Sequence, residues 1–192
     1  METDYRKFYD LENYLFEEVS RRFSEHGYLK AFDFFCIVIW KANRSKSKIA
    51  KRLLSKGHPD LDSSVVALTK SLANAADDKA RMKILIVEWG FRLPMASAIL
   101  TVLYPVSFTI YDYRIREVLN DFDKLQNKTN FDSLWNGYEL FVAAVKKIGP
   151  SEYSLRDKDR WSWGKSFYQQ LEKDIAENFS RSQAGAWERG EN

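Results

Sequence analysis

The sequence of 192 residues contains one cysteine, Cys36, and two histidines, His26 and His58. One cysteine excludes an internal disulfide, and it also excludes the four thiolate ligands of an iron–sulfur cluster. Two histidines far apart in the sequence provide neither the ligand set of a zinc site nor a cysteine–histidine nucleophile. We therefore expect no metal ion held by side chains and no cofactor.

A continuous apolar run long enough to span a membrane is also absent, and the first residues, METDYRKFYDLENYL, lack the pattern of a secretory signal. Phosphate-binding loops rich in glycine and dinucleotide fingerprints are missing too. Hydrophobic residues make up 45% and charged residues 30% of the chain, which is the balance of a globular protein. We expect a cytoplasmic protein without membrane contact.

The net charge is only +3, so the distribution of charge says more about partners than its sum. Between Lys41 and Lys56 the chain has seven basic residues and no acid. Such a run neutralises several phosphates where it faces a nucleic acid. An ordinary solvated helix face is the alternative, and the run alone does not exclude it.

Apolar residues recur at helical spacing along most of the chain, which predicts an all-α fold of about eight helices. The first helix is expected over residues 5–25 and ends at Gly27. Residues 31–40 are apolar nearly all round, so they predict a buried helix, with a buried strand as the alternative. Further helices are expected over 61–75, 79–89, 95–103, 112–122 and 131–148, and a final one from 155.

A tight turn interrupts this helical pattern in the segment 88–98. Gly90 can end one helix in the left-handed conformation, and Pro94 suits the first turn of the next. Two helices therefore meet through a short hairpin. Asp112 follows 18 positions after Pro94, immediately before another expected helix.

The hairpin, its spacing to Asp112 and the phrase IYDYRIREVL around that aspartate resemble the helix-hairpin-helix DNA glycosylases. The resemblance implies a single domain over 1–179, with two helical lobes and a cleft between the hairpin and Asp112. The residues 180–192 contain two glycines and little apolar content apart from Trp187, which predicts a flexible tail. The resemblance also implies that Asp112 is catalytic. The backbone that holds a DNA phosphate, with a monovalent cation at the hairpin, would be that of Gly90, Phe91, Arg92, Leu93 and Pro94. The basic residues expected to contact DNA are Lys48, Lys51 and Arg52.

Two positions depart from the family pattern. Arg92 stands where a second hairpin glycine is expected, so a guanidinium would alter or supplement the phosphate contact. Pro94 stands where lyase-competent members place a lysine nucleophile, and proline has no amine to form a Schiff base. The resemblance therefore implies a monofunctional enzyme that leaves an abasic site.

Asp112 also has a purely structural interpretation, because aspartate immediately before a helix is a favoured N-cap. Capping and catalysis can coexist in one residue. A carboxylate beside the sugar stabilises the oxocarbenium-like state through which a glycosidic bond breaks.

The base pocket needs aromatic walls, and most of the aromatic residues must belong to the core instead. Trp161 and Trp163 are about 200° apart on a helix, so they cannot both face one pocket. Their segment, 155–166, is either a final helix packed on the fold or a pocket wall. The candidates for stacking on a flipped base are Trp40, Tyr111, Tyr113, Trp161 and Trp163.

The sequence thus predicts a monomer that flips a damaged or hypermodified base out of double-stranded DNA and hydrolyses its N-glycosidic bond. Repair and defence against phage with modified DNA both fit this chemistry. A non-catalytic helix-hairpin-helix DNA-binding module is the alternative, and a helical interaction protein is a third.

Overall fold

The computed structural model describes residues 4–187 of the chain, and the side chains of residues 4–178. The described residues form helices and connecting loops without any strand, which confirms the all-α prediction. Residues 31–42, for which a buried strand was the alternative, form the helix α3.

The N-terminal part contains a break that the periodicity did not predict. The expected helix over 5–25 is interrupted at Tyr9 and Asp10, because the Asp10 carboxylate accepts a hydrogen bond from the Asn13 amide at 3.1 Å and caps a new helix. The helical segment that begins after Asp10 continues to His26 and ends at Gly27, whose φ is +72°, as predicted. The elements are the 3₁₀ helix η1 (Tyr5–Phe8), α1 (Leu11–Asn13), the π-helical η2 (Tyr14–Val19), α2 (Ser20–His26), α3 (Ala31–Ala42), the 3₁₀ helix η3 (Asn43–Ser45), α4 (Lys46–Leu54) and α5 (Leu61–Ala73).

The C-terminal part follows the predicted order with two differences in length. The helix after Asp112 ends at Leu119 rather than near Phe122, since Asn120 adopts a left-handed φ of 53°. The last helix continues past residue 179, so residues 180–187 of the predicted flexible tail are helical, and 188–192 lie outside the described residues. The elements are α6 (Asp78–Lys83), the π-helical η4 (Ile84–Glu88), α7 (Leu93–Leu103), α8 (Tyr113–Leu119), the 3₁₀ helix η5 (Leu125–Asn127), α9 (Phe131–Lys147) and α10 (Leu155–Trp187).

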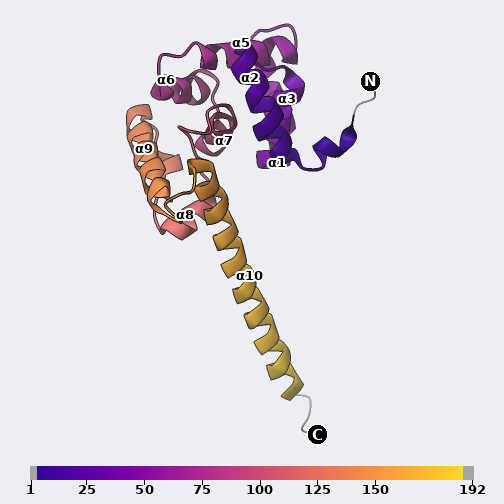
Figure 1. Cartoon of the computed structure of the whole chain (residues 1–192), viewed down its shortest axis with the longest axis vertical. Coiled ribbons are helices and arrows are strands. Elements are labelled where there is room, and N and C mark those ends of the chain that lie inside the picture. Colours follow the sequence, from indigo (N-terminus) through magenta and orange to yellow (C-terminus); the bar gives the residue numbers. More distant parts are fainter. Residues whose placement is uncertain (1–3, 188–192) are drawn as a thin grey trace.

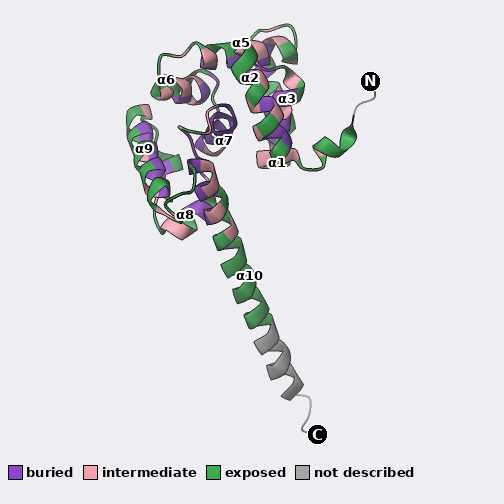
Figure 2. Cartoon of the chain, viewed as in Figure 1, coloured by how far each residue is buried: buried purple, intermediate pink, exposed green. Residues whose placement is uncertain are grey.

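Helix α7 lies at the centre of the fold, where every residue except Pro94 is buried (Figures 1 and 2). Its small residues Ala96, Ser97 and Ala98 let neighbouring elements approach closely, and α2, α3 and α6 pack around it. The hairpin and the segment that leads to Asp112 are therefore both attached to the most buried helix of the molecule.

Helix α10 packs on α8 and α9 through its first turns and then projects from the rest of the molecule (Figure 1). Residues 167–178 are exposed on all sides of it (Figure 2). Within the described range, no helix combines the length and apolar character needed to cross a membrane.

Candidate active site

The hairpin has the backbone geometry that its sequence predicts. The Trp89 amide donates to the Ile84 carbonyl at 2.9 Å, and the Phe91 amide donates to the Leu85 carbonyl at 2.8 Å. Gly90 lies between these two bonds with φ of +68°, a conformation that side-chain-bearing residues rarely adopt. The new helix α7 then begins at Leu93, with Pro94 in its first turn.

The hairpin residues differ in what they offer to a ligand. Gly90 and Arg92 are exposed, whereas Phe91 and Leu93 are buried in the core. The Phe91 amide is already bonded to Leu85, and Leu93 is buried, so the exposed hairpin positions for the predicted phosphate contact are Gly90 and Arg92.

The basic run lies beside the hairpin, although about 40 residues separate the two in the chain. The Arg52 guanidinium lies 5.9 Å from the centre of the Phe91 ring, and a Cβ placed on Gly90 would come 3.6 Å from Arg52 Nη1. Lys56 Nζ donates to the carbonyl of Glu88. Helix α4 thus adds positive charge next to the hairpin, and Lys48 and Lys51 are exposed on it.

Asp112 is the N-cap of α8, as its structural interpretation predicts. Its Oδ1 accepts a hydrogen bond from the Arg114 amide at 3.1 Å. Its Oδ2 lies 2.5 Å from Nζ of Lys41, and the two side chains are 18% and 14% exposed. Both carboxylate oxygens are therefore held, one by a backbone amide and one by an ammonium group.

Ser97 connects the hairpin helix to the segment that carries Asp112. Its buried hydroxyl donates to the Pro94 carbonyl at 3.2 Å and accepts from the Tyr111 amide at 2.9 Å. The hairpin helix and the segment that carries Asp112 are thus linked through the side chain of Ser97.

Asp112 faces a cavity of about 440 Å³ that is built from both ends of the chain. Helices α1 and α3 supply one side, and the segment before α8 together with α10 supplies the other. Within the described structure no residue of the hairpin lines this cavity, whereas the cleft was expected between the hairpin and Asp112. Its lining residues are Glu12, Trp40, Lys41, Ile110, Asp112, Arg156, Asp159, Arg160 and Trp163.

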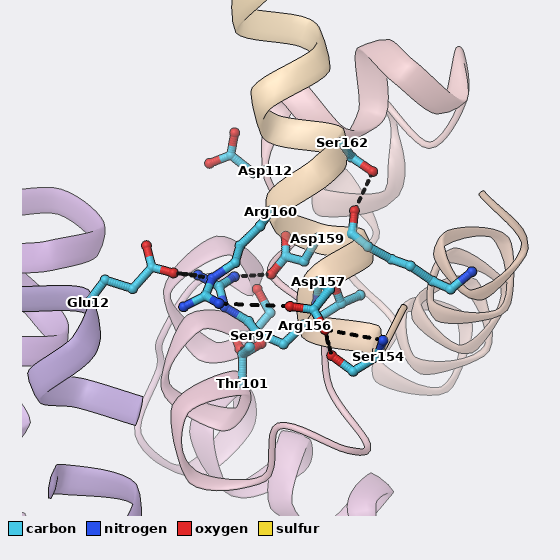
Figure 3. Close-up of polar contacts among 12 residues, drawn as sticks. Glu12, Ser97, Thr101, Asp112, Ser154, Arg156, Asp157, Asp159, Arg160 and Ser162 are labelled. Carbon is cyan, nitrogen blue, oxygen red and sulfur yellow. Dashed lines mark hydrogen bonds and ion pairs between the residues drawn. The ribbon is translucent and has the colours of Figure 1, made fainter. Parts of the chain in front are cut away.

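One wall of the cavity is a network of ion pairs centred on Arg156 (Figure 3). Its guanidinium bonds to Glu12 Oε1 at 2.6 Å and to Asp159 Oδ2 at 2.5 Å, and Arg160 Nε bonds to the same Glu12 oxygen at 2.6 Å. Burial raises the pKa of the Glu12 carboxyl, but Arg156 and Arg160 outweigh this effect and lower the pKa below its usual value. The network ties α1 to α10.

Asp159 is the second aspartate of the cavity, and its environment differs from that of Asp112. Its side chain is buried, and this burial raises the pKa of its carboxyl to about 6, against the opposing effect of the Arg156 guanidinium. The Asp159 carboxyl therefore becomes protonated at a pH slightly below neutral.

Of the five aromatic residues proposed for the base pocket, Trp40 and Trp163 line the cavity. Tyr111 belongs to the core, because its ring is buried and its hydroxyl donates to the Phe122 carbonyl at 2.7 Å. Trp161 packs against Gly149 instead, so the prediction that the two α10 tryptophans face different ways is confirmed. Tyr113 is exposed beside the cavity rather than in its lining.

Sequence reasoning did not select most of the charged lining residues. Lys41 opens the basic run and was considered only as part of it. Arg156, Asp159 and Arg160 lie in the charged segment proposed as a pocket wall, but their partner Glu12 lies 144 residues from Arg156 and no local pattern connects them.

Among the described residues, no group of three or more histidine, cysteine, aspartate or glutamate side chains is arranged to hold a metal ion. Comparison of the chain with models of protein families, with curated proteins and with solved structures found no match.

Proposed function

We propose that this protein is a helix-hairpin-helix DNA glycosylase, a cytoplasmic monomer with helical lobes on the two sides of the cavity. The observation that carries the proposal is the position of Asp112, whose fixed carboxylate lines a cavity together with Trp40 and Trp163. An N-cap alone requires neither the cavity nor the tryptophans.

In the proposed reaction a base leaves the DNA stack and enters the cavity, whose volume lies within the range of about 300–1,000 Å³ typical of small-ligand sites. The indole rings of Trp40 and Trp163 offer faces on which a base stacks. As the glycosidic bond breaks, the Asp112 carboxylate stabilises the positive charge that forms on the sugar and orients the attacking water.

The hairpin and α4 are proposed to hold the DNA backbone. The start of α7 favours a phosphate beside the exposed Gly90 and Arg92, because the positive end of the helix dipole attracts negative charge. Arg52 and Arg92 add guanidinium groups there, and Lys48 and Lys51 extend the basic surface along α4. A monovalent cation at the hairpin carbonyls belongs to the same proposal.

The enzyme is proposed to be monofunctional. Pro94 has no side-chain amine, and the side chain of Lys41, the lysine of the cavity lining, is engaged in an ion pair with Asp112. In the proposed reaction water is therefore the nucleophile and an abasic site is the product.

Asp112→Asn tests the proposal, because asparagine keeps the size and the capping ability of aspartate but removes its charge. DNA panels with damaged bases and with the modified bases of phages should be assayed for free base. We expect the variant to release base about 100-fold more slowly or worse, with DNA binding retained. Base release from the damaged DNAs alone would indicate repair, and base release from the DNAs with phage bases alone would indicate defence.

Asp60→Asn is the matched control, because Asp60 caps α5 through a bond to the Ser63 amide and does not line the cavity. It should leave base release unchanged. Full activity of Asp112→Asn on a confirmed substrate would remove the catalytic assignment.

The contact between α4 and the hairpin favours a second candidate, a non-catalytic DNA-binding module. It predicts salt-dependent DNA binding without release of base from any member of the panel. Lack of salt-dependent binding would instead favour a helical interaction protein.

A further inference from the structure

A cluster of exposed aromatic rings surrounds one guanidinium group immediately outside the cavity. The Arg114 guanidinium carbon lies 5.0 Å from the Tyr113 ring centre, 5.0 Å from that of Trp163 and 5.4 Å from that of Phe167. The Trp163 and Phe167 rings are nearly parallel, at 10°, with centres 5.5 Å apart. We call these four residues the aromatic platform.

The platform is exposed and fixed in place. Tyr113, Trp163 and Phe167 are 50%, 46% and 44% exposed, which is unusual for three large rings that adjoin one another. The Arg114 side chain donates to Ser166 Oγ at 3.3 Å, so it is anchored to α10. Rings and charge are thus presented together without a need to rearrange.

The platform is continuous with the proposed active site. Trp163 also lines the cavity, and Tyr113 directly follows Asp112 in the chain. A DNA strand that places one nucleotide in the cavity would therefore lay its neighbouring nucleotides near these rings.

The charges along α10 limit where such a strand can lie. Beyond Phe167 the apolar face continues with Leu171 and Ile175. The exposed acids Glu172, Asp174 and Glu177 outnumber Lys173 there, so this stretch would repel phosphates. The acids near the platform itself include Glu117, which accepts a hydrogen bond from Ser166 Oγ at 2.6 Å, and Asp112, which is paired with Lys41. The Arg114 guanidinium supplies positive charge there.

From this arrangement we propose that the aromatic platform stacks with unpaired bases next to the nucleotide in the cavity. The inference rests on the proposed function and makes its substrate more specific. The preferred DNA is single-stranded, or is a duplex whose base pairs beside the target have opened. Aromatic side chains combined with positive charge bind single strands in this way, since every base has a face that stacks and paired bases do not expose it.

The test uses DNA without any modified base, so it does not depend on base excision. Fluorescence anisotropy should compare a labelled oligodeoxythymidine with the same strand in a duplex with oligodeoxyadenosine. We expect the wild type to bind the single strand more tightly. Phe167→Ala should weaken single-strand binding by about 5-fold to 150-fold, which corresponds to one lost stacking contact, and should affect duplex binding less.

Two control variants lie on the same helix. Tyr168 is a 62% exposed aromatic next to Phe167 that, among the described side chains, makes no ring contact with the platform, and Ile175 lies on the apolar face among the acids. Tyr168→Ala and Ile175→Ala should both retain single-strand binding. All three positions are exposed, so the variants should fold, and circular dichroism with thermal melting checks this.

Unchanged single-strand binding by Phe167→Ala would overturn the inference. An equal loss of single-strand binding in Ile175→Ala would also overturn the inference. If this variant also sediments as a smaller particle, the apolar face of α10 is a contact between protein molecules. Base release by the wild type with no effect of Phe167→Ala would leave the glycosylase proposal intact and remove only the platform. Single-strand binding that depends on Phe167, without base release by the wild type, would support the platform and contradict the glycosylase proposal.

Discussion

Nζ of Lys41 lies 2.5 Å from Oδ2 of Asp112, although 71 residues separate them in the chain. Together with the Arg114 amide on Oδ1, this contact fixes the orientation of the carboxylate inside the cavity. Lys41 is thereby a positioning residue for the proposed chemistry, because it acts on the sugar through Asp112.

Lys41→Met should therefore reduce base release while leaving the α8 cap in place. A carboxylate displaced by about 1 Å costs up to about 100-fold in rate. Single-turnover base release measures this effect.

The control for Lys41 is Lys79→Met, which removes the exposed ion pair between Lys79 and Asp132, 2.8 Å apart. Surface pairs contribute about 0–1 kcal/mol, so the rate of base release should not change. A Lys41→Met rate equal to that of the wild type would show that the contact does not position Asp112.

Asp159 should make the stability of the protein depend on pH in a defined window. Burial raises its pKa from 3.8 to about 6, so the folded state holds the proton more tightly than the unfolded state does. The resulting stabilisation is complete below pH 3.8 and is lost as the pH rises through about 6. The lost contribution is about 3 kcal/mol at neutral pH.

Asp159→Asn keeps a polar side chain without a titrating proton, so this contribution should be absent from the variant. The free energy of unfolding in urea should be compared at pH 4 and pH 7. The wild type should lose about 2 kcal/mol relative to the variant over this interval. Parallel curves for the two proteins would contradict the raised pKa.

The helical architecture was accessible from the sequence because its determinants are local. Apolar spacing defined α5 and α9, a nearly continuous apolar run defined α3, and glycine defined the left-handed helix ends at Gly27 and Gly90. The break at Asp10 was missed because a capping hydrogen bond there outweighs an apolar pattern that continues unchanged across it.

The cavity was accessible only in part because its walls come from distant segments. The sequence selected Asp112, Trp40 and Trp163, which the fold does bring together. It also selected Tyr111, whose aromatic character suits a pocket and a core equally well, and packing placed it in the core. The Glu12–Arg156 pair depends on how α1 meets α10, which no short-range pattern encodes.

Replacement of Lys48, Lys51 and Arg52 by alanine should weaken DNA binding for all sequences alike. Each lost phosphate contact removes about 0.9 from the slope of log affinity against log salt, so the slope should become shallower by about 2 to 3. Titrations at several salt concentrations measure it. Lys124, Lys146 and Lys147 are exposed on other elements, and their triple alanine variant has the same change in net charge. Equal effects of both triple variants would mean that only the total charge matters.

Under the proposed function, DNA treated with the wild-type protein should break only after alkali or heat, since an abasic strand otherwise stays intact. Pro94 cannot form a Schiff base, and the Lys41 ammonium is held by Asp112. Incubation with abasic DNA and borohydride should therefore give no covalent adduct, because only an imine is trapped by reduction.

Lys41→Arg serves as the reference, since it keeps the positive charge but has no primary amine. An adduct formed by the wild type and lost in Lys41→Arg would identify Lys41 as a lyase nucleophile and end the monofunctional assignment. Strand cleavage without alkali in both proteins would point to an amine outside the cavity.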